Sequence, residues 1–245
     1  MGKQARREGH GETMQRMSWA ILLILLMMAM LPGGATEAGT AGVALDARMI
    51  AARETPLGNL TADALRQATG AEIAMVYALA FRDAARIDKG MVLDDAVLRA
   101  CFAFPTSKIA TLKLTPDQLK VVMQRAMSKY PERNTAFLQI SGMRVQFDSS
   151  KPIPNRIISI RIGDKNIDLS DTSTKITVAM PRELAQGAVG YLLIFNNDIA
   201  KSMDTTDITL LDALHSLARL SKEITPKVED RLIDLNEKIK DAKTS

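Results

Sequence analysis

Four stretches of the chain place hydrophobic residues at the three- and four-residue spacing of an amphipathic helix. Each follows a residue whose side chain can accept a hydrogen bond from the first turn of a helix. The expected caps are Asn59, Asp94, Thr115 and Asp207. The clearest start is the segment 115–118, because Pro116 suits the first helical position and Gln118 can complete a capping box. We therefore expect four helices, the first ending at Gly70 and the second near Cys101.

Between these helices lie mostly apolar runs of strand length. The expected strands are 72–80, 108–114, 137–147, 156–162, 165–169 and 175–180. Gly142 would interrupt the third, and Gly163-Asp164 would form a hairpin turn between the fourth and the fifth. Because strands and helices alternate without a strict βαβ rhythm, the pattern predicts a layered domain of the α/β or α+β class, with a mixed sheet and packed helices.

The last third of the chain is less regular. Residues 187–190 are expected to form a loop that leads into Tyr191–Phe195. From Glu229 onward the sequence is rich in charge, and its few apolar residues, Leu232, Leu235 and Ile239, stand at helical spacing. We expect this tail to be a solvated helical face or a fraying end.

The N-terminus has the three parts of a secretory signal peptide: a basic start, an uncharged run at 18–31 and a small-residue exit. A 14-residue run spans about 21 Å as a helix, less than the roughly 30 Å of a bilayer core, which favours cleavage near Ala35 or Ala38 over a retained anchor. We therefore expect an exported protein, periplasmic or extracellular, which contacts a membrane only if residues 18–31 are retained. The expected divisions are 1–35 (signal peptide), 36–45 (flexible lead-in), 46–233 (one domain) and 234–245 (charged tail).

Composition excludes several classes of function. The leader carries a net charge of +2, which leaves a net charge of only +2 on the rest of the chain, so we expect no nucleic-acid partner. The single cysteine, Cys101, forms no intramolecular disulfide, and its apolar surroundings indicate a buried hydrophobe more than a reactive thiol.

Histidine is nearly absent. The two in the chain are His10, which lies in the leader, and His215. A dinuclear phosphoesterase site needs several imidazoles and carboxylates to hold its ions, and the motifs of serine hydrolases, P-loops and dinucleotide sites are missing as well. We therefore expect no catalytic residues, no metal site and no cofactor in this chain.

Short motifs along the chain resemble the C-terminal, substrate-binding domain of the 5′-nucleotidase family. The segments that carry the resemblance are 53–65 (R-x-x-x-x-x-G-N-L-x-x-D-A), 81–82, 87–92, 102–104, 112–115, 137–142 (F-L-Q-I-S-G), 187–191 and 224–232. They occur in the family's order and cover about residues 46–233. The resemblance implies a domain that holds a nucleoside or nucleotide, while the metal ions belong to a separate metallophosphatase domain.

The resemblance also implies which residues contact the ligand. Phe104 and Tyr191 match the two rings between which the family holds a base, and Arg53 and Arg82 match its two arginines. Asn197 lies where the family has an acidic residue for the ribose hydroxyls. Stacking on an aromatic face contributes about 1–3 kcal/mol per base, and guanidinium suits phosphate through paired hydrogen bonds.

Four departures from the family pattern leave three interpretations open. Tyr77 and Leu79 replace an asparagine and a glycine, Pro105 replaces the glycine after the first ring, and Val189 replaces an aspartate. These changes make the expected cleft less polar. The chain is then a nucleoside- or nucleotide-binding module, a structural or interaction protein whose cleft has filled, or the non-catalytic subunit of a split nucleotidase that pairs with a separate metallophosphatase subunit.

Overall fold

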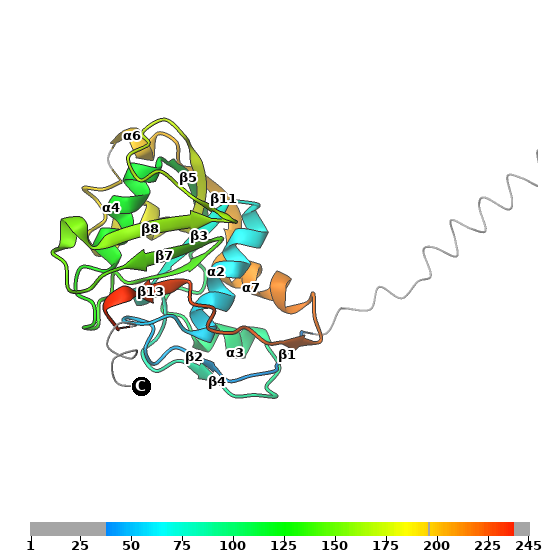
Figure 1. The fold of residues 1–245 in the computed structure, drawn as a ribbon. Coiled ribbons are helices and arrows are strands. Elements are labelled where there is room, and N and C mark those ends of the chain that lie inside the picture. Colours follow the sequence, from blue (N-terminus) through cyan, green and yellow to red (C-terminus); the bar gives the residue numbers. More distant parts are fainter. Residues whose placement is uncertain (1–37, 196, 238–245) are drawn as a thin grey trace, which may run out of the picture. The chain divides into compact units, whose positions relative to one another are not determined.

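The computed structural model describes residues 38–195 and 197–237 (Figure 1). Its main sheet has five strands in the order β11-β5-β10-β3-β6. These strands are β3 (Ile73–Tyr77), β5 (Lys108–Leu114), β6 (Leu138–Ser141), β10 (Ile176–Pro181) and β11 (Asp204–Thr209). β10 is parallel to β3, whereas β5 is antiparallel to β10 and β11, and β6 is antiparallel to β3. The mixed sheet is confirmed, and β11 is a strand that the sequence pattern did not predict.

A second sheet has four strands in the order β13-β7-β8-β9. They are β7 (Met143–Phe147), β8 (Ile157–Ile162), β9 (Lys165–Asn166) and β13 (Leu232–Asp234). The predicted break at Gly142 is confirmed: its φ of 79° turns the chain out of β6, in the first sheet, and into β7, in the second. The hairpin around 163–164 is confirmed as well, because β8 and β9 pair antiparallel across it.

The prediction that the tail from Glu229 is a solvated helical face or a fraying end is wrong at residues 232–234, whereas residues 235–237 are helical. Residues Leu232–Asp234 form β13, which lies parallel to β7, and Arg231 and Asp234 are buried. The helical spacing of a few apolar residues was too short a signal to compete with an available sheet edge. Residues 238–245, which include Ile239, lie outside the described part of the chain.

The helices begin at threonine caps where the chain offers a choice. α2 (Pro56–Thr69) is capped by Thr55, whose hydroxyl accepts the Gly58 N–H, so the predicted cap Asn59 is wrong and lies inside the helix. α7 (Leu210–Ala218) is capped by Thr209, and the predicted cap Asp207 belongs to β11. In both cases a threonine stands directly before the first helical residue, and its hydroxyl supplies the acceptor.

The other two predicted helix starts are confirmed. α3 (Asp95–Ala100) is capped by the Asp94 carboxylate, and α4 (Pro116–Ala126) begins with the expected capping box at Thr115. Shorter helical segments are η1 (Ala78–Ala80), η2 (Ile153–Asn155), α5 (Arg182–Ala185), η3 (Ala188–Gly190) and α6 (Asn197–Ala200). Two short ladders complete the described structure: β1 (Thr40–Ala41) with β12 (Glu223–Ile224), and β2 (Leu45–Asp46) with β4 (Arg86–Ile87).

The helices bury the main sheet. α2 packs against β3, β6 and β10 and lies beside α7, as Figure 1 shows, while α4 packs against β8 of the second sheet. The apolar residues of these elements form one core, which confirms a layered mixed α/β fold. No helix in the described ranges is long and apolar enough to cross a membrane. The predicted signal peptide lies outside those ranges, and the predicted domain limits stay predictions.

Candidate functional site

The candidate site lies at one end of the five-stranded sheet, which we call the loop edge. The parallel strands β3 and β10 end there at Tyr77 and Pro181, and β5 and β6 begin there at Lys108 and Leu138. Open sheets with parallel strands bind ligands outside the carboxyl ends of those strands. The segments that leave this end, 78–83, 101–107 and 182–195, carry most of the residues that the sequence nominates for ligand binding.

Phe104 is the open aromatic ring of the loop edge. It is 47% exposed and lines a pocket of about 360 Å³ together with residues 103–108, Arg182 and Glu183. The loop that carries it is fixed by backbone: Ala103 N–H donates to Ala80 O at 2.9 Å, and Ser107 N–H donates to Phe104 O at 3.1 Å. A planar ligand can therefore reach this ring without a rearrangement of the loop.

Two arginines accompany Phe104. Arg82 N–H donates to Cys101 O at 2.8 Å, which joins the Arg82 segment to the start of the Phe104 loop. Arg182 follows β10 directly and lines the Phe104 pocket. Both side chains are exposed, and neither makes a hydrogen bond or an ion pair with another residue of the described ranges. Their guanidinium groups are thus available to an anionic ligand.

Three further polar side chains at the loop edge are buried or paired: Ser107, Tyr77 and Cys101. The Ser107 hydroxyl donates to the Glu183 carboxylate. Burial, with a smaller contribution from the nearby charge of Glu183, raises the pKa of Tyr77 to about 12. Burial raises the pKa of the Cys101 thiol to about 11, so this cysteine is the inert hydrophobe that the sequence indicates.

Tyr191, the second ring nominated by the sequence, lies in the core. It is fully buried, its hydroxyl donates to Ala136 O at 2.8 Å, and its ring stacks on Phe195 with centroids 5.6 Å apart. Burial also raises its pKa well above the usual range. The role of Tyr191 as a ligand-stacking ring stays a prediction, and it would require the ring to leave this packing.

Arg53 lies away from the Phe104 pocket. Its side chain is 61% exposed, stands 3.9 Å from the Glu237 carboxylate and lines a separate cavity of about 160 Å³ with Tyr130 and Phe147. The side chain of Asn197 lies outside the described residues, although its backbone begins α6. Of the five nominated residues, the structure brings Phe104 and Arg82 onto neighbouring segments and keeps Tyr191 and Arg53 apart from the open pocket.

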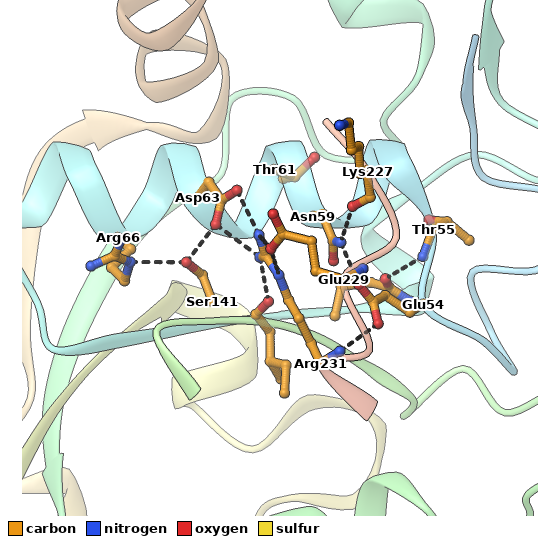
Figure 2. A network of polar contacts seen from close by, with 12 residues as sticks. Glu54, Thr55, Asn59, Thr61, Asp63, Arg66, Ser141, Lys227, Glu229 and Arg231 are labelled. Atoms are coloured by element: carbon orange, nitrogen blue, oxygen red, sulfur yellow. Dashed lines mark hydrogen bonds and ion pairs between the residues drawn. The ribbon is translucent and has the colours of Figure 1, made fainter. Parts of the chain in front are cut away.

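The motif residues that carry the family resemblance meet elsewhere, in a polar network around Arg231 (Figure 2). The Arg231 guanidinium donates to both carboxylate oxygens of Asp63 at 2.8 and 2.9 Å, to Ile140 O at 2.8 Å, and to Glu229 at 2.9 and 3.0 Å. Burial alone would lower the pKa of Arg231, but its bonds to the two carboxylates outweigh that cost and raise it. We call Asp63, Glu229 and Arg231 the Arg231 clasp.

Glu54 and Asn59 extend the clasp along α2. The Glu54 carboxylate accepts the backbone N–H groups of Glu229 and Arg231, each at 2.7 Å, and the Asn59 amide donates to Glu54 and to Lys227 O. These bonds tie the C-terminal segment to the first turns of α2. The pairing of Asp63 with Arg231 joins residues 168 positions apart, so local sequence patterns could not reveal it.

Gly58 and Gln139, two further motif residues, have a packing role. A Cβ on Gly58 would lie 2.2 Å from the Gln139 side-chain oxygen, so glycine makes room for that amide. Gln139 in turn accepts Thr55 N–H and donates to Ile50 O and Arg53 O, which fixes the loop before α2. The G-N-L segment (residues 58–60) therefore packs α2 against β6, and none of its residues lines the Phe104 pocket.

Among residues 38–195 and 197–237, no group of three or more His, Cys, Asp or Glu side chains is arranged to hold a metal ion. His215 stands 4.0 Å from Asp95.

Comparison with known proteins identifies relatives of this chain. A family model of the 5′-nucleotidase C-terminal domain matches residues 33–195. The chain is 28% identical over 215 residues to a 5′-nucleotidase-related protein of Glossina morsitans morsitans, covering 79% of this chain and 37% of the relative. It is also 28% identical over 168 residues to an apyrase of Aedes albopictus, covering 64% of this chain and 29% of that protein.

Solved structures share the fold. The 5′-nucleotidase precursor of Thermus thermophilus superposes with a TM-score of 0.72 at 21% identity, over 90% of this chain and 42% of that one. The NAD nucleotidase of Haemophilus influenzae gives 0.64 at 14% identity, over 94% and 46%. The chain therefore spans less than half the length of each of these relatives.

Proposed function

Because the chain belongs to the 5′-nucleotidase C-terminal domain family, we propose that it is a binding module for a nucleoside or nucleotide, with Phe104 as the ring on which the base stacks. The observation that carries the proposal is the open face of Phe104 beside a pocket of about 360 Å³. A base gains about 1–3 kcal/mol from one such stack, whichever base it is.

Arg82 and Arg182 would supply the anion contacts. Both are exposed cations without a partner in the described ranges, and Arg182 lines the same pocket as Phe104. Guanidinium donates paired hydrogen bonds to phosphate, so these residues would favour a nucleotide over its nucleoside. In this proposal Arg182 takes the place that the resemblance gives to Arg53, whose side chain faces a different cavity.

The proposal assigns no hydrolysis to this chain alone. This part of the proposal rests on the histidine content. The sequence has two histidines, one of them in the leader, and two are too few for a dinuclear metal site. A purified sample of the chain with Zn²⁺ or Mn²⁺ is expected to release no phosphate from nucleotides. Turnover by that sample would overturn this part of the proposal.

We also propose export through residues 1–35, which predicts a secreted protein whose first residue lies close to Ala35 or Ala38 by N-terminal sequencing.

Calorimetric titration of AMP and adenosine tests the binding site. Phe104→Ala should weaken both ligands by about 5- to 100-fold, because it removes one stacking face. The matched control is Val121→Ala on α4, a side chain of similar exposure at 45%, which should leave both affinities unchanged. Binding that is equal in the wild type and Phe104→Ala, or absent from both, would contradict the proposal.

The arginines are tested in the same titration. Arg182→Gln should weaken AMP by about 10-fold and adenosine hardly at all, because the lost hydrogen bonds go to phosphate. Arg219→Gln is the control, since Arg219 is an exposed arginine beyond the end of α7. Equal losses for AMP and adenosine would remove Arg182 from the phosphate contact.

A second candidate function is that of a non-catalytic subunit that pairs with a separate metallophosphatase subunit. The observation that favours it is a set of exposed apolar side chains on the segments of the loop edge. They are Leu79 at 43%, Phe104 at 47%, Leu192 at 65% and Leu193 at 93% exposure. Exposed apolar residues of this kind often mark a protein interface. Size-exclusion chromatography with a metallophosphatase domain of a family member would test it: Leu193→Asp should abolish co-elution, and the absence of co-elution with wild type would dismiss it.

A further inference from the structure

A groove of about 310 Å³ lies at the end of the five-stranded sheet opposite the loop edge. Strand β6 runs from the loop edge at Leu138 to Ser141, and the groove begins at Ser141 and Gly142. Three residue steps along a strand separate the two ends by on the order of 10 Å. The groove is therefore distinct from the Phe104 pocket, and no residue lines both.

The floor of the groove contains a pair of like charges. Arg144 of β7 and Arg161 of β8 are direct partners in the antiparallel register of the second sheet. Like charges at directly opposite positions repel one another and destabilise a sheet. Neither guanidinium is neutralised closely: Arg144 has no hydrogen-bond or ion-pair partner in the described ranges, and Arg161 stands 3.9 Å from Asp164, which is fully exposed. An exposed ion pair of this kind contributes little to the stability of the fold.

A third arginine, Arg66 of α2, lines the same groove, and Figure 2 shows its contact with Ser141. Arg66 donates through Nε to the Ser141 hydroxyl at 2.9 Å, and that hydroxyl donates to Asp63 at 2.6 Å. The two terminal nitrogens of Arg66 make no hydrogen bond or ion pair with another described residue. Ser141 thus aims the planar guanidinium while its outer edge stays open.

The clasp makes no direct ion pair with these three arginines, although its two carboxylates and one guanidinium bring a net charge of −1 to the groove. Asp63 and Glu229 also line the groove, but both carboxylates are bound to Arg231. Over the whole lining, four arginines stand against the carboxylates of Asp63, Asp164 and Glu229, which leaves a net charge of +1. Because this excess gathers around a concave surface, it raises the local concentration of small anions.

We propose that the groove between Arg66, Arg144 and Arg161 binds a phosphate-type oxyanion, either free phosphate or the terminal phosphate of a small phosphomonoester. Guanidinium groups donate paired hydrogen bonds to such an anion from several directions. A bound anion would also remove the repulsion between Arg144 and Arg161. The site does not depend on nucleotide binding at Phe104.

Thermal unfolding of the full chain tests the site with inorganic phosphate as the probe, in buffers matched in ionic strength with chloride. For a dissociation constant on the order of 1 mM, 10 mM phosphate should raise Tm by about 3–6 °C. The double variant Arg144→Gln/Arg161→Gln should lose this rise. The control Arg219→Gln/Lys222→Gln, which removes two exposed charges elsewhere, should keep it.

Equilibrium dialysis with labelled phosphate provides a measurement that is independent of folding stability. The double Gln variant should bind at least 10-fold more weakly, whereas Arg144→Lys/Arg161→Lys should retain part of the affinity because the charges remain. Competition by glycerol 2-phosphate as strongly as by phosphate would assign a phosphomonoester, and weaker competition would assign the free ion. No rise in Tm for the wild type, or an equal rise in the double Gln variant, would overturn the proposal.

Discussion

The Arg231 clasp and the loop edge differ in the burial and pairing of their arginine side chains. In the clasp, the Arg231 side chain is 10% exposed and its guanidinium makes five hydrogen bonds. At the loop edge, Phe104 is open to solvent, and the side chains of Arg82 and Arg182 make no hydrogen bond or ion pair in the described ranges. A buried charge is stable only when it is paired, whereas a side chain that binds a ligand needs its hydrogen-bonding groups free of other partners.

This difference separates two kinds of family feature. The G-N-L-x-x-D segment and the closing E-x-R segment serve the clasp and the packing of α2, as the contacts of Asp63, Glu229 and Arg231 show (Figure 2). Their contacts join α2 to the C-terminal segment and so belong to the architecture of the domain. The residues that would contact a ligand lie at the other end of the main sheet, where this chain also departs from the family pattern. Family membership is thus a stronger statement about architecture than about the ligand.

Among changes to polar groups, opening the clasp should have the largest effect on stability. Arg231→Met leaves the Asp63 and Glu229 carboxylates without their cation, and we expect it to lower the free energy of unfolding by about 3 kcal/mol. Urea denaturation measures the loss. Arg219→Met, at an exposed arginine outside the clasp, should cost less than about 0.5 kcal/mol. Nucleotide affinity of the folded Arg231→Met protein should be unchanged, so a large loss of affinity would erase the distinction between the two regions.

Much of the fold could be predicted from local patterns. The apolar runs at 108–114 and 175–180, the capping box at Thr115 and the break at Gly142 each depend on residues close in sequence, and the structure confirms them. The errors arose where two local signals competed. Asn59 and Thr55 can both cap, but Pro56 at the first helical position favours the residue before it.

Long-range contacts explain what the sequence could not show. β13 is held by its pairing with β7 and by the hydrogen bond that Arg231 N–H donates to Glu54. Both contacts join residues far apart in the sequence, so no local pattern predicts them. The candidate site is harder still to predict. Phe104 and Tyr191 are both large aromatic residues at family positions, and only their packing separates an open ring from a buried one. Arg182 was missed although it follows a predicted strand end, which is the position that the topology of parallel strands favours.

Tyr191 provides the next test, because it is a buried ring on a segment of the loop edge. Tyr191→Phe removes the hydroxyl that donates to Ala136 O, and we expect the free energy of unfolding to fall by about 1–2 kcal/mol. Denaturation with urea measures this loss, and titration with AMP should give an affinity within 2-fold of wild type. A selective loss of AMP affinity with unchanged stability would instead indicate that the ring leaves the core to contact the ligand.

The smallest effect on stability should come from Phe104, the ring that we propose as the stacking surface for the base. Phe104 is 47% exposed, so Phe104→Ala removes few buried contacts, and we expect the free energy of unfolding to change by no more than about 0.5 kcal/mol. Phe102→Ala is the matched contrast: its ring is fully buried 5.1 Å from the Phe81 ring, and its loss should cost about 3–5 kcal/mol. Urea denaturation of both variants beside the AMP titration separates the roles of two phenylalanines that are two residues apart. If Phe104→Ala destabilises the protein as much as Phe102→Ala does, then Phe104 is a packing residue and the loop edge is a second part of the core.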